Sequence, residues 1–181
     1  MSNPLLHIEG LPPFSQIKPE HIQPAIQELI EENRQAIEQV LKQPHFTWEN
    51  FIEPLSEAGE HLSRAWSPIS HLNSVKNSPE LRDAYQACLS LLSEYSTWVG
   101  QHRGLYNAYL ALKNSPEFAT YSVAQKKAIE NALRDFELSG IGLSEEKQKR
   151  YGEIVARLSE LSAQFSNNVL DATMGWEKVI E

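Results

Sequence analysis

Apolar residues recur every three or four positions along most of this chain, the spacing that places side chains on one face of an α-helix. This pattern predicts an all-α domain of about five or six helices, packed as an antiparallel, bundle-like array over residues 18–181. Residues 1–17 differ, because Pro4, Pro12 and Pro13 each disfavour helix at the preceding residue. We therefore expect an extended N-terminal arm followed by a single helical domain.

The first predicted helix follows the arm and ends at Gln43-Pro44. Pro24 is best tolerated there if it lies in the first turns. Thr47 is placed to cap a short helix near Trp48, and the apolar spacing then continues through Leu72. Proline at position 68 should bend this longer helix, because proline removes an amide donor and clashes with the preceding turn.

Two similar segments, KNSPEL at residues 76–81 and KNSPEF at residues 113–118, each place Ser at an N-cap, Pro at the first helical position and Glu in the first turn. After the first segment, the pattern predicts one long helix over residues 79–112 that absorbs Gly100 and Gly104. After the second, only a short turn precedes Ser122. We interpret the pair as two helix starts with the same capping chemistry, and we disfavour a solenoid repeat.

Ser122 and Gln125 fit a capping box, and Gly140 is suited to end the helix that they begin. Ser144 then opens the last helix, which has the clearest periodicity in the chain. Its apolar positions approach a heptad seam: Tyr151, Ile154, Leu158, Leu161, Phe165, Asn168 and Ala172, widened by Val155 and Val169. Such a seam suits a coiled-coil partner, but within one helical domain we expect it to pack onto its own neighbours.

The composition is that of an ordinary globular protein, with 41% hydrophobic and 22% charged residues in a chain of 181. A formal net charge of -8 argues against a nucleic-acid partner, because phosphate binding depends on clustered Lys and Arg. The basic groups Lys126-Lys127 and Lys147-x-Lys149-Arg150 lie on predicted helices rich in polar residues, so we interpret them as solvated faces.

The location of the protein is predicted from its cysteine use and its hydrophobic runs. Cys88 is the single cysteine, which excludes an internal disulfide and suits a reducing compartment, and its neighbours predict that it lies in the core. The N-terminus shows no signal-peptide pattern, and no apolar run approaches the roughly 20 residues needed to cross a bilayer. We expect a cytoplasmic protein without a membrane partner.

Candidate chemistry is sparse. No H-E-x-x-H zinc motif, nucleophile turn or glycine-rich phosphate loop is present in the sequence. Glu57 and His61 lie four residues apart on one predicted helix, but two candidate ligands do not make a metal site, so we favour a surface pair. His71 and His102 are interpreted as hydrogen-bonded packing residues. No catalytic, cofactor-binding or metal-binding residue is assigned.

Four long segments carry a family resemblance: HLNSVKNSPELRDAY, LSEYSTWVGQHRGLYNAY, KKAIENALRDFELSGIGL and RYGEIVARLSELSAQFSNNVLDATMGW. They closely resemble the N-terminal part of the thimet oligopeptidase family of zinc metallopeptidases. The resemblance implies a polypeptide several times longer, with the zinc site in its later part, so no catalytic or zinc-binding residue can be assigned here. It also explains why the apolar periodicity runs to the last residues, and we expect the native polypeptide to continue.

The resemblance implies that the N-terminal helices of that family form one wall of a channel, which admits short peptides and excludes folded proteins. We therefore expect this chain alone to be inactive, as the non-catalytic domain of a zinc metalloendopeptidase. Trp98, Tyr106 and Tyr109 are candidate peptide contacts, although their helical spacing favours the core. Two alternatives remain: a free-standing helical module that binds peptides or a partner protein, and a catalytic half that is a separate chain. Docking of a separate half predicts a large apolar patch on the last helix, but so does truncation.

Overall fold

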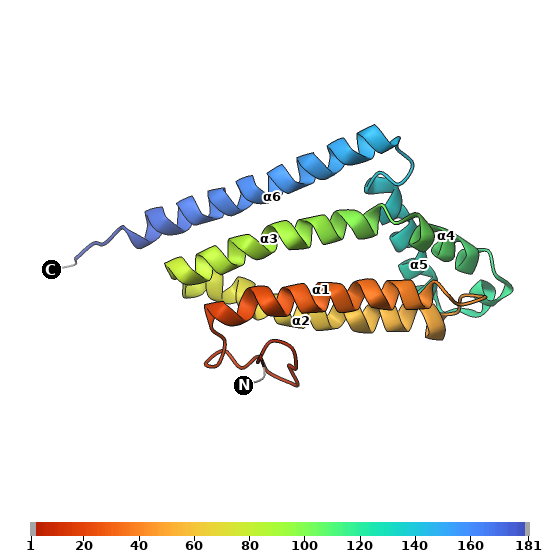
Figure 1. Ribbon diagram of the computed structural model, residues 1–181, viewed down its shortest axis with the longest axis horizontal. Helices are drawn as coiled ribbons and strands as arrows, with labels where there is room; N and C mark the ends of the chain where they lie inside the picture. The colour runs from red at the N-terminus through yellow and green to blue at the C-terminus, as the bar shows by residue number, and fades with distance from the viewer. Residues whose placement is uncertain (1–2, 180–181) are drawn as a thin grey trace.

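The computed structural model describes residues 3–179, and this part of the chain forms helices without any strand (Figure 1). The six α-helices are α1 (Pro19–Val40), α2 (Glu53–Val75), α3 (Pro79–Gly100), α4 (Arg103–Lys113), α5 (Val123–Leu138) and α6 (Glu145–Met174). Helix α1 contacts both α2 and α3, and α6 runs antiparallel to α3 on its other side. The shorter α4 and α5 pack together across one end (Figure 1). The predicted all-α class is confirmed.

Most of the predicted helix starts are confirmed by their caps. The Ser78 hydroxyl accepts a hydrogen bond from the Leu81 amide, and Pro79 occupies the first helical position of α3. Ser122 and Gln125 form the expected reciprocal capping box at α5. Ser115 begins only a 3-10 turn, Pro116–Thr120, without a side-chain cap. The two similar segments therefore begin different structures, an α-helix after Ser78 and a 3-10 turn after Ser115.

The short helix expected near Trp48 is a π-helical turn, Trp48–Ile52, which is capped by Thr47 and runs directly into α2. Pro54 lies within the first two positions of α2, directly after the π-helical turn, where it removes one amide donor from the continuous segment. Helix α2 then continues through Pro68 to Val75. One continuous segment thus follows the loop after α1.

The prediction of one helix over residues 79–112 is wrong, because the helix ends at Gly100 and α4 begins at Arg103. A methyl group added to Gly100 would lie only 2.6 Å from the Ser139 side chain, so the end of α5 approaches the backbone at this glycine. His102 then caps α4, because its Nδ1 accepts a hydrogen bond from the Leu105 amide at 3.1 Å. Periodicity alone does not report either interaction.

The buried apolar side chains form two clusters. The first lies between α1, α2 and α3 and includes Leu5 from the N-terminal arm, so the arm packs against the core. The second lies at the other end of α1, where α4, α5 and the π-helical turn meet. Helix α1 contributes Ile22, Ile26 and Leu29 to the first cluster, and Ile37 and Val40 to the second.

Candidate functional site

An apolar cleft of about 620 Å³ is lined by residues from α2, α3 and α5, with contributions from α1 and α4. Most of its wall is aliphatic or aromatic, including Leu55, Trp66, Leu92, Val99, Leu105 and Phe136. Gly59 also lines it, and a methyl group there would meet nothing within 4 Å, so the cleft has free space beside α2. The volume and lining suit an apolar side chain or a short peptide segment.

A buried polar residue joins three helices beside this cleft. The Asn33 side-chain amide donates hydrogen bonds to the carbonyl oxygens of Leu29 and Ala58, at 2.8 and 2.9 Å. Its Oδ1 accepts a hydrogen bond from the Tyr95 hydroxyl at 3.2 Å. Asn33 therefore connects α1, α2 and α3 with its polar atoms satisfied. Asn33 is not among the candidates predicted from the sequence, although it interrupts the apolar stripe of α1 between Ile30 and Ile37.

Two further polar side chains, those of Tyr109 and Asp135, line the cleft. Burial raises the pKa of the Tyr109 phenol, so this group stays protonated near neutral pH. Its ring packs edge-on against Phe51, with the ring centroids 4.9 Å apart. Asp135 is the only charged residue among those that line the cleft. This lining can hold an apolar or weakly cationic group, but it offers no paired nucleophile and base.

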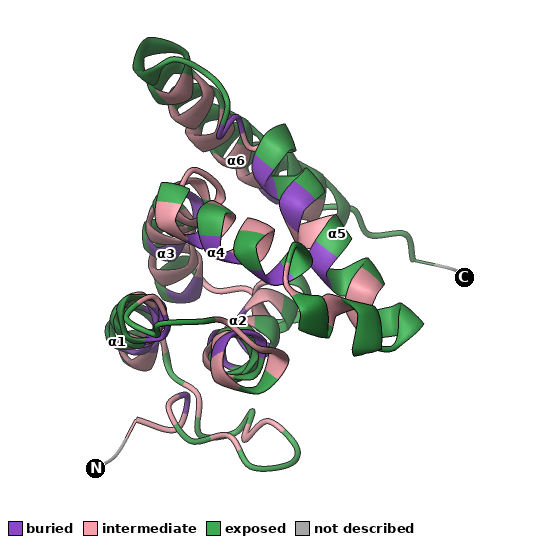
Figure 2. Cartoon of the chain, turned by 90° about the vertical axis from the view of Figure 1, so that its right-hand side faces the viewer, coloured by how far each residue is buried: buried purple, intermediate pink, exposed green. Residues whose placement is uncertain are grey.

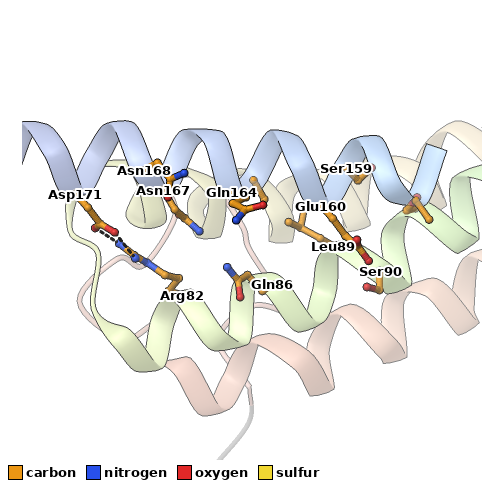
Figure 3. Close-up of a pocket in the computed structure, with 13 residues that line it drawn as sticks. Arg82, Gln86, Leu89, Ser90, Ser159, Glu160, Gln164, Asn167, Asn168 and Asp171 are labelled. Atoms are coloured by element: carbon orange, nitrogen blue, oxygen red, sulfur yellow. Dashed lines mark hydrogen bonds and ion pairs between the residues drawn. The ribbon is translucent and has the colours of Figure 1, made fainter. Parts of the chain in front are cut away.

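The interface between α3 and α6 is polar (Figure 3). The Arg82 guanidinium donates to both carboxylate oxygens of Asp171, at 3.0 and 2.7 Å, and these bonds lower the pKa of Asp171. Beside this pair, a groove of about 430 Å³ is lined with amide side chains such as Gln86 and Gln164. Ser93 Oγ is buried there without a hydrogen-bond partner among the described residues. The two helices therefore meet through polar and small side chains.

The prediction that the apolar seam of the last helix packs onto its neighbours is wrong for most of that seam, because only Tyr151 and Val155 among its members are half-buried and the others are exposed. Helix α6 meets α3 through a face of small and polar residues, which includes Ala156, Ser159, Ala163 and Asn167. Small residues let the helices approach, and the polar face finds partners such as Arg82 on α3. The seam consequently faces outward, and its exposed apolar residues are Ile154, Leu158, Leu161, Phe165 and Val169. In Figure 2 the ribbon of α6 carries both exposed and intermediate residues, as expected for a helix that is covered on one face only.

The titratable candidates from the sequence do not come together. Glu57 and His61 are both exposed on α2, as expected for a surface pair. Within residues 3–179, no group of three or more His, Cys, Asp or Glu residues is arranged to hold a metal ion. His102 caps α4 and packs edge-on against Trp98 at 4.8 Å, which confirms its packing role. His71 is exposed and lies beside the Phe14 ring at 5.7 Å.

Cys88 lies in the first cluster with no exposed surface, as predicted. Burial raises the pKa of its thiol to about 11. The thiol is therefore both inaccessible and protonated at neutral pH.

The three candidate aromatic contacts are half-buried and pack on the second cluster. The Arg34 guanidinium lies 4.2 Å from the centre of the Trp98 ring, a cation–π geometry. Tyr106 packs edge-on against Phe136 at 5.9 Å. The expectation that packing predominates at these positions is confirmed, while Tyr109 also contributes to the cleft wall.

The basic groups that the sequence predicts to form solvated faces lie on the surfaces of α5 and α6. Lys127 is exposed, and Lys126 reaches back to donate a hydrogen bond to the Ala119 carbonyl at 2.7 Å. Lys147, Lys149 and Arg150 are all exposed on the first turns of α6. Among the described helices, none combines the length and the apolar character that a membrane crossing requires.

Taken together, these features define an all-helical domain with an apolar cleft and an outward apolar seam, in which residues 3–179 bring no metal ligands together. Residues 26–148 match the family described as the N-terminal domain of neurolysin and thimet oligopeptidase. The chain belongs to this family.

Similarity to individual proteins extends over the whole chain. The chain is 82% identical over 181 residues to Oligopeptidase A of Haemophilus influenzae and 61% identical to Oligopeptidase A of Escherichia coli. It is 36% identical over 179 residues to a protein of Arabidopsis thaliana named probable cytosolic oligopeptidase A. These matches cover 99–100% of this chain but only 26–27% of each relative. The chain thus spans about a quarter of the length of the relatives that it matches.

Proposed function

We propose that this chain is the non-catalytic N-terminal domain of an oligopeptidase A-like zinc metalloendopeptidase, located in the cytoplasm, and that it forms one wall of the channel for short peptides. The observation that carries the proposal is the match to a family of N-terminal domains, together with relatives named Oligopeptidase A of which the chain spans 27%. Residues 3–179 offer no fitting set of zinc ligands, so in this proposal zinc binds elsewhere in the longer enzyme and this chain alone cleaves no peptide.

The geometry supports a role as a wall. The helices form two apolar clusters that are joined by α1, an arrangement that resists deformation because close-packed interiors have low compressibility. A rigid wall can exclude folded proteins by shape without contributing a catalytic group. The apolar cleft gives the same domain a recess that can receive a peptide side chain.

The first experiment is to identify the native protein in extracts of its source with an antibody raised against this chain. The captured protein is then assayed on short peptides with and without a zinc chelator, beside the purified 181-residue chain. We expect a band several times heavier than 20.6 kDa, hydrolysis by the captured protein that the chelator abolishes, and no hydrolysis by the 181-residue chain. Chelator-sensitive hydrolysis by the 181-residue chain would overturn the inactive-wall assignment.

A second candidate is a free-standing helical module that binds peptides or a partner protein. The apolar cleft favours it, because the cleft can hold a peptide segment without any catalytic group. This candidate predicts a native band near 20.6 kDa and no associated peptidase activity.

A further inference from the structure

The outer seam of α6, defined as Ile154, Leu158, Leu161, Phe165 and Val169, is exposed although its sequence pattern is that of a packed helix face. Its members recur at intervals of three and four residues, so they form one continuous stripe along about 22 Å of helix. Other exposed apolar residues of the helices, such as Val75 and Val123, occur singly. A stripe of this length is unlike the scattered apolar residues of an ordinary surface.

The inward face of α6 cannot exchange places with the outer seam. It already bonds to α3 through the bidentate pair of Asp171 and Arg82, and it fills the space beside α3 with Ala156 and Ala163. Rotating the helix would bring bulky apolar residues against the polar side chains of α3. The seam is therefore directed outward by the contacts of the opposite face.

Basic residues lie along one edge of the seam. Arg150 and Arg157 are seven residues apart, on the same side of the helix, and their side chains are 69% and 65% exposed. Each makes only a surface ion pair with a glutamate three residues later, an interaction that holds little free energy. Both arginines remain able to pair with carboxylates on a helix that covers the seam, as flanking charges do in coiled coils.

A second copy of the chain fits the seam less well. In an antiparallel self-pairing that stacks Leu158 on the Leu161 of the other copy, heptad geometry places Arg150 opposite Asp171. Asp171 is already held by two hydrogen bonds from Arg82. Self-pairing would therefore either break the bond between Asp171 and Arg82 or leave Arg150 without a carboxylate to pair with in the other copy.

We propose that the outer seam is the docking face for an amphipathic helix from the remaining length of the oligopeptidase polypeptide, with apolar residues against the seam and carboxylates facing Arg150 and Arg157. This inference rests on the proposed function. The relatives provide the reason for this occupant, because the chain spans only 27% of Oligopeptidase A and the seam lies on its last helix. The docked helix attaches the first domain to the rest of the enzyme.

Cysteine labelling tests the proposal in the long native protein. Phe165→Cys places a thiol on the seam, and Leu138→Cys is the matched control on α5, since these positions are 71% and 69% exposed. Cys88 is buried and contributes little background. Maleimide labelling at each position is followed by mass spectrometry of the peptide that contains it, in the long protein and in the 181-residue chain.

We expect both cysteines to label at similar rates in the 181-residue chain. In the long protein, labelling at position 165 should slow by about tenfold or more, as expected for a site that opens only by local unfolding, whereas position 138 serves as the reference. Equal labelling of position 165 in both proteins would overturn the proposal, and so would protection that already appears in the 181-residue chain and grows with its concentration, which would assign the seam to a second copy. Failure of the proposed function gives a different result, because the antibody would then detect only a band near 20.6 kDa in the extract and no protein of greater length.

Discussion

The hydrogen bond between Asn33 and Tyr95 gives a quantitative test of how the three long helices are held together. Asn33 is 5% exposed and makes three hydrogen bonds, to Leu29, Ala58 and Tyr95. Each buried hydrogen bond contributes about 1 kcal/mol net to stability. Asn33→Ala should therefore lower the free energy of unfolding by about 3 kcal/mol.

The contribution of the Tyr95 bond can be separated by a double-mutant cycle. Tyr95→Phe removes one hydroxyl and should cost about 1 kcal/mol. The bond that it removes is also lost in Asn33→Ala, so the double variant should cost about 3 kcal/mol rather than 4, which gives a coupling energy of about 1 kcal/mol.

Urea unfolding of the 181-residue chain measures these differences. With a slope of about 2 kcal/mol per molar urea, Asn33→Ala should move the midpoint down by about 1.5 M and Tyr95→Phe by about 0.5 M. The slope itself should stay constant, which serves as the control for unchanged two-state behaviour. Costs that add to within about 0.3 kcal/mol would refute the reasoning, because the two side chains would then not share a bond.

Two further predictions concern the loop after α5 and the contact between α3 and α6. Gly140→Ala should lower the free energy of unfolding by about 1–2 kcal/mol, because Gly140 has a φ of +85° and a methyl group there would lie 2.8 Å from the Leu143 side chain. Thermal melting measures this, and Gly142→Ala, with nothing within 4 Å, should change stability by less than about 0.5 kcal/mol. For Asp171, the folded-state pKa is lowered by Arg82, so its stabilising contribution is present above the ordinary value of about 3.9 and is lost as the pH falls through the folded value. Carboxyl NMR should show Asp171 titrating below its usual range, whereas an unshifted titration, or the same shift in Arg82→Ala, would contradict the assignment.

Local signals in the sequence predicted much of the fold. Ser78, Thr47 and Ser122 cap the segments that they were expected to cap, because a cap depends on residues within one turn of itself. The break between α3 and α4 could not be predicted in the same way. It depends on the approach of Ser139 to Gly100, which brings together residues far apart in the sequence.

The candidate site was harder to predict than the fold. Apolar periodicity identified the correct stripe on the last helix but assigned it to the interior, because the pattern reports which residues share a face and not what that face meets. The outcome was decided by a bidentate ion pair from α3 and by small residues on the opposite face of α6. The Asn33 contacts and the cleft likewise depend on three or more helices meeting, for which a single sequence gave no direct signal.

Helix α1 takes part in both apolar clusters, with Asn33 between its two sets of buried residues. The two ends of the domain therefore share one structural element, and neither cluster can come apart without releasing buried surface on that helix. Unfolding should be cooperative along the whole length of α1 rather than proceeding one end at a time. Native-state amide exchange would then show similar opening free energies at Ile26 and Ile37.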